Sequence, residues 1–407
     1  MPMALEGIRV LDLTVNQQGP ACTTYLADMG ADVIKIEGVD RVDPGRYVVP
    51  ILNTFVDNAV ETDPNYYFEA HNRNKRGIAV DLKKEAGKEV IYRLVPKSDV
   101  FATNLRKQAV DRLGLSYETL SRYNPRLIYA RASGYGPRGP DKDKPGYDFI
   151  GQAKSGLMRL ATEEGQPPSE AGVGLSDQTR ALNLAFGILA ALLARERYGV
   201  GQEVDCSLFG ASILIHSMWL QHYLLSGVSP TKAKRSHNNN PFWRVYEASD
   251  GKWLILSMAD SDAYWPALCR VASLDDVANR PEFASHALRM QNAAAIIHRL
   301  DKAFVTKPAA HWVKSLQAEG VVCDLVYDYE DIVNDPQVWA NEYIAELDLP
   351  DGRRIKVPGI AATLSKTPGK IRKSAPPHGQ DTEAILTELA GYTGEEIARL
   401  REEGVIK

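Results

Sequence analysis

The chain has 407 residues, with 48 Lys and Arg against 52 Asp and Glu, so its formal net charge is −4. Hydrophobic residues make up 44% and charged residues 25%, which is the composition of a globular protein and not of a disordered one. The lack of a basic excess argues against nucleic acid or an anionic membrane surface as a partner. At roughly 150 residues per domain, this length predicts two or three domains.

The N-terminus, the apolar runs and the cysteines predict a compartment. Residues 1–7 lack the basic start and the long apolar core of a signal peptide, and the apolar run 182–194 is shorter than the roughly 20 residues that span a bilayer. We therefore expect a cytoplasmic protein with no membrane partner. The eight histidines and the four cysteines are scattered without metal-binding spacing, so we expect no metal and reduced thiols at Cys22, Cys206, Cys269 and Cys323.

The first third of the chain predicts strands that alternate with helices. An apolar run at 8–13 is typical of a buried strand, and Pro20 after the turn at 17–20 favours a helix over 20–29. Further strands are expected at 31–37, 77–82, 99–104 and 127–133, with a helix over 84–94. This alternation predicts an α/β fold with a parallel, doubly wound sheet.

The rest of the chain predicts a second, smaller unit. A helix over 178–198 is apolar almost all round its middle, which suits a core or a subunit interface. A strand at 204–208 and a helix over 208–225 precede a polar linker at 226–241. Asp250-Gly251 then predicts a hairpin turn between strands 242–247 and 253–257. The remaining elements are helices over 262–271 and 287–304, a strand at 321–327 and terminal helices within 382–403.

Sequence motifs argue against nicotinamide and nucleotide triphosphate chemistry. A dinucleotide site needs GxGxxG after the first strand, but Gly19 is the only glycine there. Glu37 does end the second strand, where an acidic residue holds a ribose, so one of the two required features is present. The chain has neither the GxSxG elbow of serine hydrolases nor a P-loop.

Asp177 is the carboxylate that the sequence singles out. It follows the Gly-rich segment 172–176 and directly precedes the most apolar helix. An aspartate in this place is a favoured N-cap, stabilising a helix by about 1 kcal/mol. It can also act as a nucleophile that the helix dipole keeps ionised. The two interpretations are compatible, because a capping side chain is also fixed in place.

Basic residues occur where an anionic ligand could bind. The cluster 72–76 precedes a strand, and such a cluster is either a solvated turn or a grip for a phosphate. Arg106 and Lys107 follow the strand 99–104, at the carboxyl edge where open parallel sheets bind ligands. Lys142 and Lys144 lie in the Gly- and Pro-rich loop 134–146, where exposed lysines are common.

The chain resembles the family III CoA transferases, the formyl-CoA and carnitine CoA transferase group, over nearly its whole length. The similar segments occur in order, at Leu5–Pro20, Leu26–Glu37, Asn72–Leu82, Asp111–Gly136, Pro145–Met158 and Gly172–Leu208. This resemblance implies a Rossmann-like large domain built from residues 1–225 and 331–407, with a small α+β domain over 226–330. It also implies a homodimer of two interlocked chains.

The resemblance implies a mechanism without a metal, with CoA and acyl-CoA as substrates. Asp177 would attack the donor thioester and then carry CoA as an aspartyl thioester until a carboxylic acid accepts it. Gln17 would donate its amide to the reacting oxygens. The residues expected to contact CoA are Arg41, Asn72, Lys75, Arg76, Asn104, Arg106 and Lys144, and those on the substrate side are Tyr147 and Asp148.

Two other functions stay open from the sequence. Acyl-CoA racemases of the same family carry a Gly-His-Asp motif where this chain has Gly146-Tyr147-Asp148, and tyrosine lacks the basicity needed to abstract the proton. A catalytically silent acyl-CoA binding protein would not need Asp177. Asn238–Asn240 lies roughly where the formyl-CoA enzymes have a glycine loop, and the sequence leaves the donor and acceptor acids open.

Overall fold

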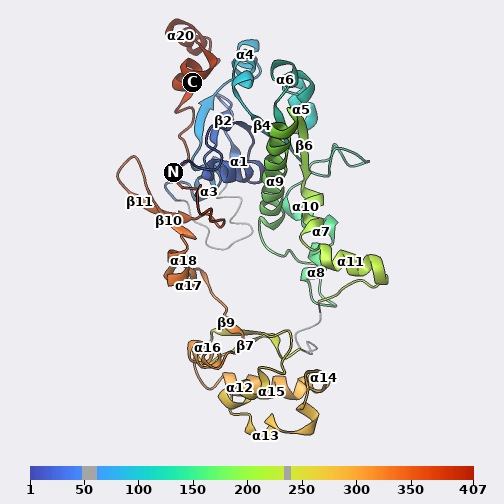
Figure 1. Cartoon of the computed structure of the whole chain (residues 1–407). Helices are drawn as coiled ribbons and strands as arrows, with labels where there is room; N and C mark the ends of the chain where they lie inside the picture. The colour runs from blue at the N-terminus through green and yellow to red at the C-terminus, as the bar shows by residue number, and fades with distance from the viewer. Residues whose placement is uncertain (48–61, 233–239) are drawn as a thin grey trace. The chain divides into compact units, whose positions relative to one another are not determined.

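The computed structural model describes residues 1–47, 62–232 and 240–407, and the chain divides into two compact units (Figure 1). The large unit comprises Met1–Lys232 and Trp339–Lys407, and the small unit comprises Ala233–Val338. The sequence placed the corresponding boundaries after residues 225 and 330. Asn238 and Asn239, and with them most of the region compared with the glycine loop, lie outside the described residues.

A six-stranded sheet with the order β3-β2-β1-β4-β5-β6 forms the centre of the large unit. All of its neighbouring strands pair in parallel, with Leu11 opposite both Ile34 and Phe101. The predicted α/β fold with a parallel sheet is confirmed. The strands are β1 (Arg9–Leu13), β2 (Asp32–Glu37), β3 (Arg76–Ala79), β4 (Val100–Thr103), β5 (Ile128–Ser133) and β6 (Gln202–Ser207).

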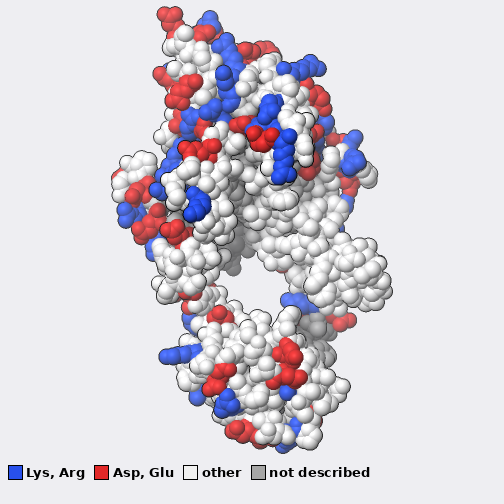
Figure 2. Space-filling view, viewed as in Figure 1, with Lys and Arg blue, Asp and Glu red and all other residues white. Residues whose placement is uncertain are grey.

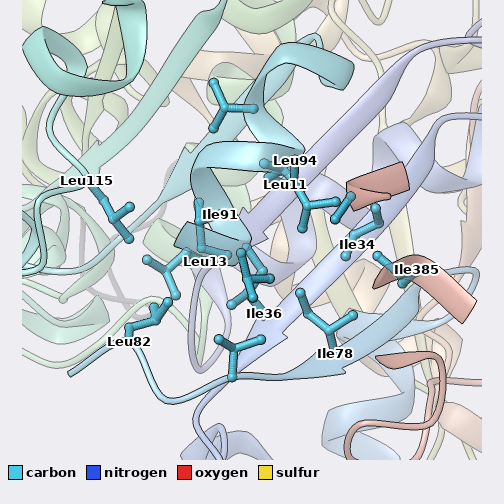
Figure 3. Close-up of a cluster of buried hydrophobic side chains, with 14 of the residues drawn as sticks. Leu11, Leu13, Ile34, Ile36, Ile78, Leu82, Ile91, Leu94, Leu115 and Ile385 are labelled. Carbon is cyan, nitrogen blue, oxygen red and sulfur yellow. The ribbon is translucent and has the colours of Figure 1, made fainter. Parts of the chain in front are cut away.

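Helices bury both faces of this sheet, which explains why its strands read as continuous apolar runs. Successive strand residues point to opposite faces, so Val10 packs with α1 (Gln18–Asp28) and α9 (Leu175–Tyr198), and its neighbour Leu11 packs with α4 (Glu85–Leu94) and the C-terminal helices. Figure 3 shows the second of these cores, in which Ile34, Ile91 and Ile385 lie together.

Shorter elements complete the large unit. The helix predicted over 208–225 is divided, because α10 (Leu208–Leu214) ends and α11 (Ser217–Ser226) restarts at His216. The hairpin of β10 (Ile344–Asp348) and β11 (Arg354–Pro358) was not predicted. The other helical elements are η1 (Pro44–Tyr47), α3 (Tyr66–Asn72), η2 (Val95–Lys97), α5 (Lys107–Arg112), α6 (Tyr117–Tyr123), α7 (Asp148–Ser155), α8 (Leu157–Ala161), α19 (Thr382–Ile385), η5 (Leu386–Ala390) and α20 (Gly394–Glu402). The boundary between the two units falls within α18 (Pro336–Ala340).

The small unit packs helices against a three-stranded antiparallel sheet with the order β7-β8-β9. Gly251, at φ +73°, makes the predicted turn between β7 (Trp243–Glu247) and β8 (Trp253–Ser257). Tyr246, Phe304 and Trp312 pack edge to face in its core. The other elements are β9 (Cys323–Leu325), α12 (Trp265–Val271), α13 (Asp275–Ala278), η4 (Pro281–Phe283), α14 (His286–Gln291), α15 (Ala293–Phe304), α16 (Ala309–Ala318) and α17 (Tyr329–Asn334).

Three properties of the described residues concern membrane spans, metal ligands and cysteines. No helix among them has both the length and the apolar character that a bilayer span needs. No group of three or more potential metal ligands occurs within these same ranges. All four cysteines of the chain are described, and each has a free thiol.

Candidate active site

From β1 the chain adds β2 and β3 on one side of the sheet and β4, β5 and β6 on the other, so the strand order reverses between β1 and β4. Ligands of open α/β sheets bind at the carboxyl ends of the strands at such a point. A cavity of about 410 Å³ opens there, between the loops that follow β1, β4 and β5. The cavity brings together residues that the sequence predicted separately, namely Arg41, Asn104, Arg106, Lys144 and Tyr147. A second cavity of about 280 Å³ adjoins it, because both are lined by Lys107, Arg131, Lys142 and Asp143.

The cavity has a cationic lining. Arg41 and Arg106 are exposed, and their guanidinium groups have no ion-pair partner within the described ranges. Lys144 is also exposed, although its ammonium lies 2.6 Å from the carboxylate of Asp141. Unpaired guanidinium groups at the edge of a cavity are suited to phosphate oxygens, which they bind through paired N–H donors.

Asn104 lies in the cavity wall but has a structural task. Its Oδ1 accepts from the backbone N–H of Val15 at 2.9 Å, and its Nδ2 donates to the carbonyl of the same residue at 2.7 Å. This pair of bonds fixes the loop between β1 and α1, which carries Gln17 and leads into Gln18, the first residue of α1. Asn104 therefore shapes the site through Val15, and it has one Nδ2 hydrogen left for a ligand.

The placement of Lys75 and Asn72 corrects the prediction that they contact CoA. Lys75 is fully buried, and its ammonium donates to Asp12 Oδ2 at 2.9 Å, to the carbonyls of Pro20 and His71 at 2.9 Å and to Asn72 Oδ1 at 3.0 Å. These acceptors use all of its N–H groups. Lys75 and Asn72 therefore tie β1, α1 and α3 together beneath the site. Lys75 has no N–H left for a phosphate, and Asn72 is buried with its Nδ2 donating to the Phe68 carbonyl at 3.2 Å.

Arg76 lies at the wrong edge of the sheet for the predicted contact with CoA. It is the first residue of β3, so it lies at the amino edge, whereas the cavity lies at the carboxyl edge. Its guanidinium donates to Asp32 at 2.6 and 2.9 Å and to Glu388 at 3.1 Å. Glu37, considered above as a ribose ligand, is buried and bound by Arg46 at 2.7 Å.

The start of α9 differs from the prediction and changes the role of Asp177. The helix begins at Leu175, with Gly174 as its N-cap in the left-handed region at φ +76°, so Asp177 is the third residue of the first turn. The interpretation of Asp177 as the N-cap is wrong. Asp148 supplies the capping acceptors, because its carboxylate accepts from the backbone N–H of Gly174 at 3.1 Å and of Asp177 at 3.0 Å. Gln152 Nε2 holds that carboxylate at 2.7 Å.

Two pairs of neighbouring residues connect Asp177 with the cavity. Gln17 packs on Gly174, so closely that a β-carbon at position 174 would lie 2.6 Å from its Nε2, while the next residue, Gln18, lines the cavity. Likewise Asp148 caps α9 while the preceding Tyr147 is 72% exposed and lines the cavity. The structure thus brings Gln17, Asp148 and Asp177 together next to the cationic cavity.

The electrostatic setting of Asp177 is that of a reactive carboxylate. Burial raises the pKa of Asp177 from 3.8 to about 7, with Arg180 opposing the rise and Asp148 adding to it. Oδ1 of Asp177 is buried and has no hydrogen-bond partner among the described residues. A carboxylate that has lost water without gaining donors is a stronger base and nucleophile than one in solution.

A polar network behind Asp177 was not predicted. The Tyr25 hydroxyl donates to Gln178 Oε1, and Gln178 Nε2 lies 3.2 Å from His71 Nε2. His71 Nδ1 lies 2.8 Å from the Tyr67 carbonyl, which only accepts, so Nδ1 carries the proton and Nε2 accepts from Gln178. Burial lowers the pKa of His71 to about 4, which keeps it neutral. This network fixes the first turn of α9 against α1 and α3.

Comparison with known proteins identifies the family. A family model described as CoA-transferase family III matches residues 5–382. The chain belongs to the family III CoA transferases. The prediction of this family, and of CoA transfer as the enzymatic activity, is confirmed by that match and by relatives that are named as CoA-transferases.

The relatives and the solved structures extend over nearly the whole chain. The acetyl-CoA:oxalate CoA-transferase of Acetobacter aceti is 36% identical over 362 residues, which cover 87% of this chain and 89% of the relative. The succinyl-CoA:glutarate CoA-transferase of Mus musculus is 30% identical over 404 residues, with 99% and 90% covered. The crystal structure of a CAIB/BAIF family protein from Brucella suis superimposes with a TM-score of 0.84 at 29% identity, and covers 96% of this chain and 100% of that one.

Proposed function

We propose that this enzyme moves CoA from an acyl-CoA to a carboxylic acid through a covalent aspartyl-CoA thioester on Asp177. The observation that carries the proposal is the carboxylate itself, which lies in the first turn of a long helix with a buried oxygen that has no partner among the described residues, next to a cationic cavity. A silent binding protein would gain nothing from such a costly side chain.

The chemistry follows from the nucleophile. Asp177 attacks the thioester carbonyl of the donor, the C–S bond breaks, and an acyl-aspartyl anhydride and CoA thiolate result. The thiolate then attacks the aspartyl carbonyl, which releases the donor acid as its carboxylate and leaves CoA on Asp177. The acceptor carboxylate reverses these two steps. Each exchange is thereby divided into two easier ones, and no step requires a metal.

Gln17 and the cavity supply binding and stabilisation. The amide of Gln17 packs on Gly174, the N-cap of the helix whose first turn carries Asp177, so it can donate to the oxyanion that develops at the attacked carbonyl. Arg41, Arg106 and Lys144 are the cavity cations that we assign to the phosphates of CoA. Tyr147, at the same edge, is assigned to the acyl side of the substrate.

We also propose a cytoplasmic homodimer. The four free cysteines are consistent with a reducing compartment. Helix α9 leaves an apolar stripe exposed, and Phe186 within it is 73% accessible. The stripe continues over α10 and α11, where Figure 2 shows almost no charged atoms. Soluble monomers rarely expose so large a patch, and a second copy of this chain is its proposed occupant. The stripe consists of Leu182, Phe186, Leu189, Leu193, Leu214, Met218, Trp219 and Leu225.

Mass spectrometry of the protein with a panel of acyl-CoAs tests the covalent mechanism. Hydroxylamine or borohydride traps the intermediate, and we expect the modification on the peptide that contains Asp177, in the wild type and not in Asp177→Ala. Donors that label also define the substrate class. If no donor labels the wild type, the covalent mechanism fails, and deuterium exchange at Cα of a 2-methylacyl-CoA then tests the racemase alternative.

A further inference from the structure

Arg180 is a buried cation that the mechanism above does not use. It lies three residues after Asp177 on α9, and side chains at this spacing lie on the same helix face. It is the largest fully buried side chain of the described structure. Nη1 donates to the Ser133 carbonyl at 3.0 Å, but Nε and Nη2 have no partner among the described residues. A buried guanidinium left so incompletely bonded is costly and calls for a function.

The groups that face Arg180 leave Asp177 as its counterion. The thiols of Cys22 on α1 and Cys206 on β6 are neutral, because burial raises their pKa values, that of Cys206 to about 11. Asp205 on β6 also acts on Arg180, but more weakly than Asp177, and its carboxylate accepts from the Ser133 hydroxyl at 2.6 Å and lies 3.6 Å from Arg131. Of the two carboxylates that act on Arg180 within the described ranges, Asp177 has the larger effect.

The groups that face Asp177 from other elements do not neutralise it. Asp148 on α7 has the same charge and is committed to the backbone of α9. Tyr67 on α3 senses both carboxylates, and burial raises the pKa of its hydroxyl, which stays uncharged. Arg180 is therefore the only positive charge that acts on Asp177 within the described structure. The two side chains form no direct ion pair, since Oδ1 of Asp177 and two nitrogens of Arg180 have no partner in this part of the chain.

We propose that Arg180 is a positioning residue whose buried charge balances, without a direct bond, the single negative charge that the reaction moves between Asp177, the CoA sulfur and the released carboxylate. This proposal rests on the covalent mechanism proposed above. It assigns a role to a residue that never touches the reacting atoms.

The charge balance of each step fits a fixed countercharge. Before attack, the negative charge lies on Asp177, and in the tetrahedral adduct it lies on the oxyanion. When the C–S bond breaks, it lies on the CoA thiolate, and when the aspartyl thioester forms, it lies on the departing carboxylate. One negative charge is present throughout, so one permanently charged guanidinium matches every state without rearrangement.

The absence of a direct bond is part of the proposed role. A bidentate guanidinium–carboxylate pair would hold the oxygen lone pairs that must attack the thioester. A cation held a short way off favours ionisation of Asp177 and leaves those lone pairs free. The hydrogen bond from Nη1 to the Ser133 carbonyl, at the end of β5, holds the guanidinium group in place.

The pH dependence of labelling at Asp177 tests this role. We compare the wild type with Arg180→Met and Arg180→Lys in single-turnover labelling by acyl-CoA, read by mass spectrometry from pH 5 to 9. Removing the charge is expected to raise the labelling midpoint by about one pH unit or more, since a nearby opposite charge shifts a carboxyl pKa by roughly 1–3 units. At a pH below the midpoint, a rise of one unit lowers the labelling rate of Arg180→Met about tenfold relative to the wild type. Arg180→Lys restores a positive charge and is expected to move the midpoint back toward that of the wild type.

Arg195→Met is the matched control. Arg195 is another buried arginine of α9, with its guanidinium 2.8 Å from Asp99, and it lies about 27 Å along the helix from Asp177 at 1.5 Å per residue. Its removal is expected to lower thermal stability and to leave the labelling midpoint unchanged. A wild type that labels, with the same midpoint in Arg180→Met, overturns the role of Arg180 and leaves the covalent mechanism standing.

Two further outcomes complete the test. A wild type that never labels refutes the covalent mechanism on which the role of Arg180 rests. If Arg180→Met does not fold, the comparison uses Arg180→Lys and Arg180→Gln, with circular dichroism as the check on folding. Equal midpoints in the charged and the neutral variant then show that Arg180 only holds the end of β5.

Discussion

Replacing Asp177 by asparagine is expected to stabilise the protein while it abolishes covalent labelling. The pKa of Asp177 is raised by burial from 3.8 to about 7. A carboxyl whose pKa is higher in the folded than in the unfolded state holds its proton longer in the native form. Its contribution is therefore present at low pH and is lost as the pH rises through 7. At pH 8 the folded wild type therefore holds a buried negative charge on Asp177, which the Asp177→Asn variant lacks.

The magnitude follows from the size of the shift. A change from 3.8 to about 7 is about 3 units, and at 1.36 kcal/mol per unit the ionised side chain costs about 4 kcal/mol above pH 7. An asparagine at this position would resemble the protonated carboxyl in shape and charge. The stabilisation by Asp177→Asn is therefore expected to grow between pH 4 and pH 7 and to stay constant above that range.

Thermal unfolding of both proteins across this pH range is the assay. Asp40→Asn serves as the matched control, because Asp40 is exposed on the loop after β2 and its substitution should give no pH-dependent difference. Two results would refute the reasoning. One is an Asp177→Asn variant that melts below the wild type at pH 8, and the other is a difference between them that does not change with pH.

Three further substitutions test separate parts of the site. Asp148→Asn removes the like charge beside Asp177, so the labelling midpoint is expected to move to lower pH, the direction opposite to that of Arg180→Met. Arg106→Ala is expected to raise the KM for acyl-CoA about tenfold or more with little change in kcat, because it removes a hydrogen bond to a charged phosphate, and the loss of such a bond weakens binding by about this factor. Lys75→Met leaves Asp12 buried without its closest cation, and is expected to cost about 3–5 kcal/mol in denaturant unfolding.

Each of these has a control and a contrary result. Asp324→Asn, Arg122→Ala and Lys83→Met change exposed residues of the same types, and are expected to leave the labelling midpoint, the KM and the unfolding free energy unchanged, respectively. A raised midpoint in Asp148→Asn would mean that loss of the helix cap outweighs the change in charge. An unchanged KM in Arg106→Ala would exclude it from the phosphate site. A Lys75→Met variant of normal stability with a raised KM would restore the discarded CoA contact.

The parallel sheet was predictable because its central strands β1, β2, β4 and β5 are buried on both faces. Val10 and Leu11 face opposite cores, so both had to be apolar, and the run could not be confused with a surface strand. The hairpin β10–β11 has a different pattern, in which most residues are partly or fully exposed. Its charged residues, among them Arg354 with Asp348 at 2.6 Å, hide the strand signal.

The start of α9 could not be located from local sequence. Capping signals are read from the residue before the helix, but Gly174 carries no side-chain acceptor. The acceptors come from Asp148, which is 26 residues earlier in the chain and is placed by the fold. For this reason Asp177 was assigned to the cap, three residues from its true place.

Misassignment of Lys75 has the same origin. The segment Asn72–Arg76 shows a cluster of polar and basic residues, which is typical of a solvated or ligand-binding turn. What the segment does not show is Asp12, 63 residues away, whose buried carboxylate needs a cation. Arg180 had a local signal that could have been used, since it is the one charged residue between Asp177 and Arg195 in an otherwise apolar and amide-bearing helix.

The division of tasks between two carboxylates explains how the site keeps its nucleophile free. The first turn of any helix offers unpaired N–H groups, and the nearest carboxylate normally binds them. Here Asp148 accepts the N–H groups of Gly174 and Asp177, so the side chain of Asp177 finds no donor within its own turn. A capping Asp177 would be more stable and less reactive. By supplying the cap from another helix, the fold satisfies α9 and leaves Asp177 with a free, buried oxygen.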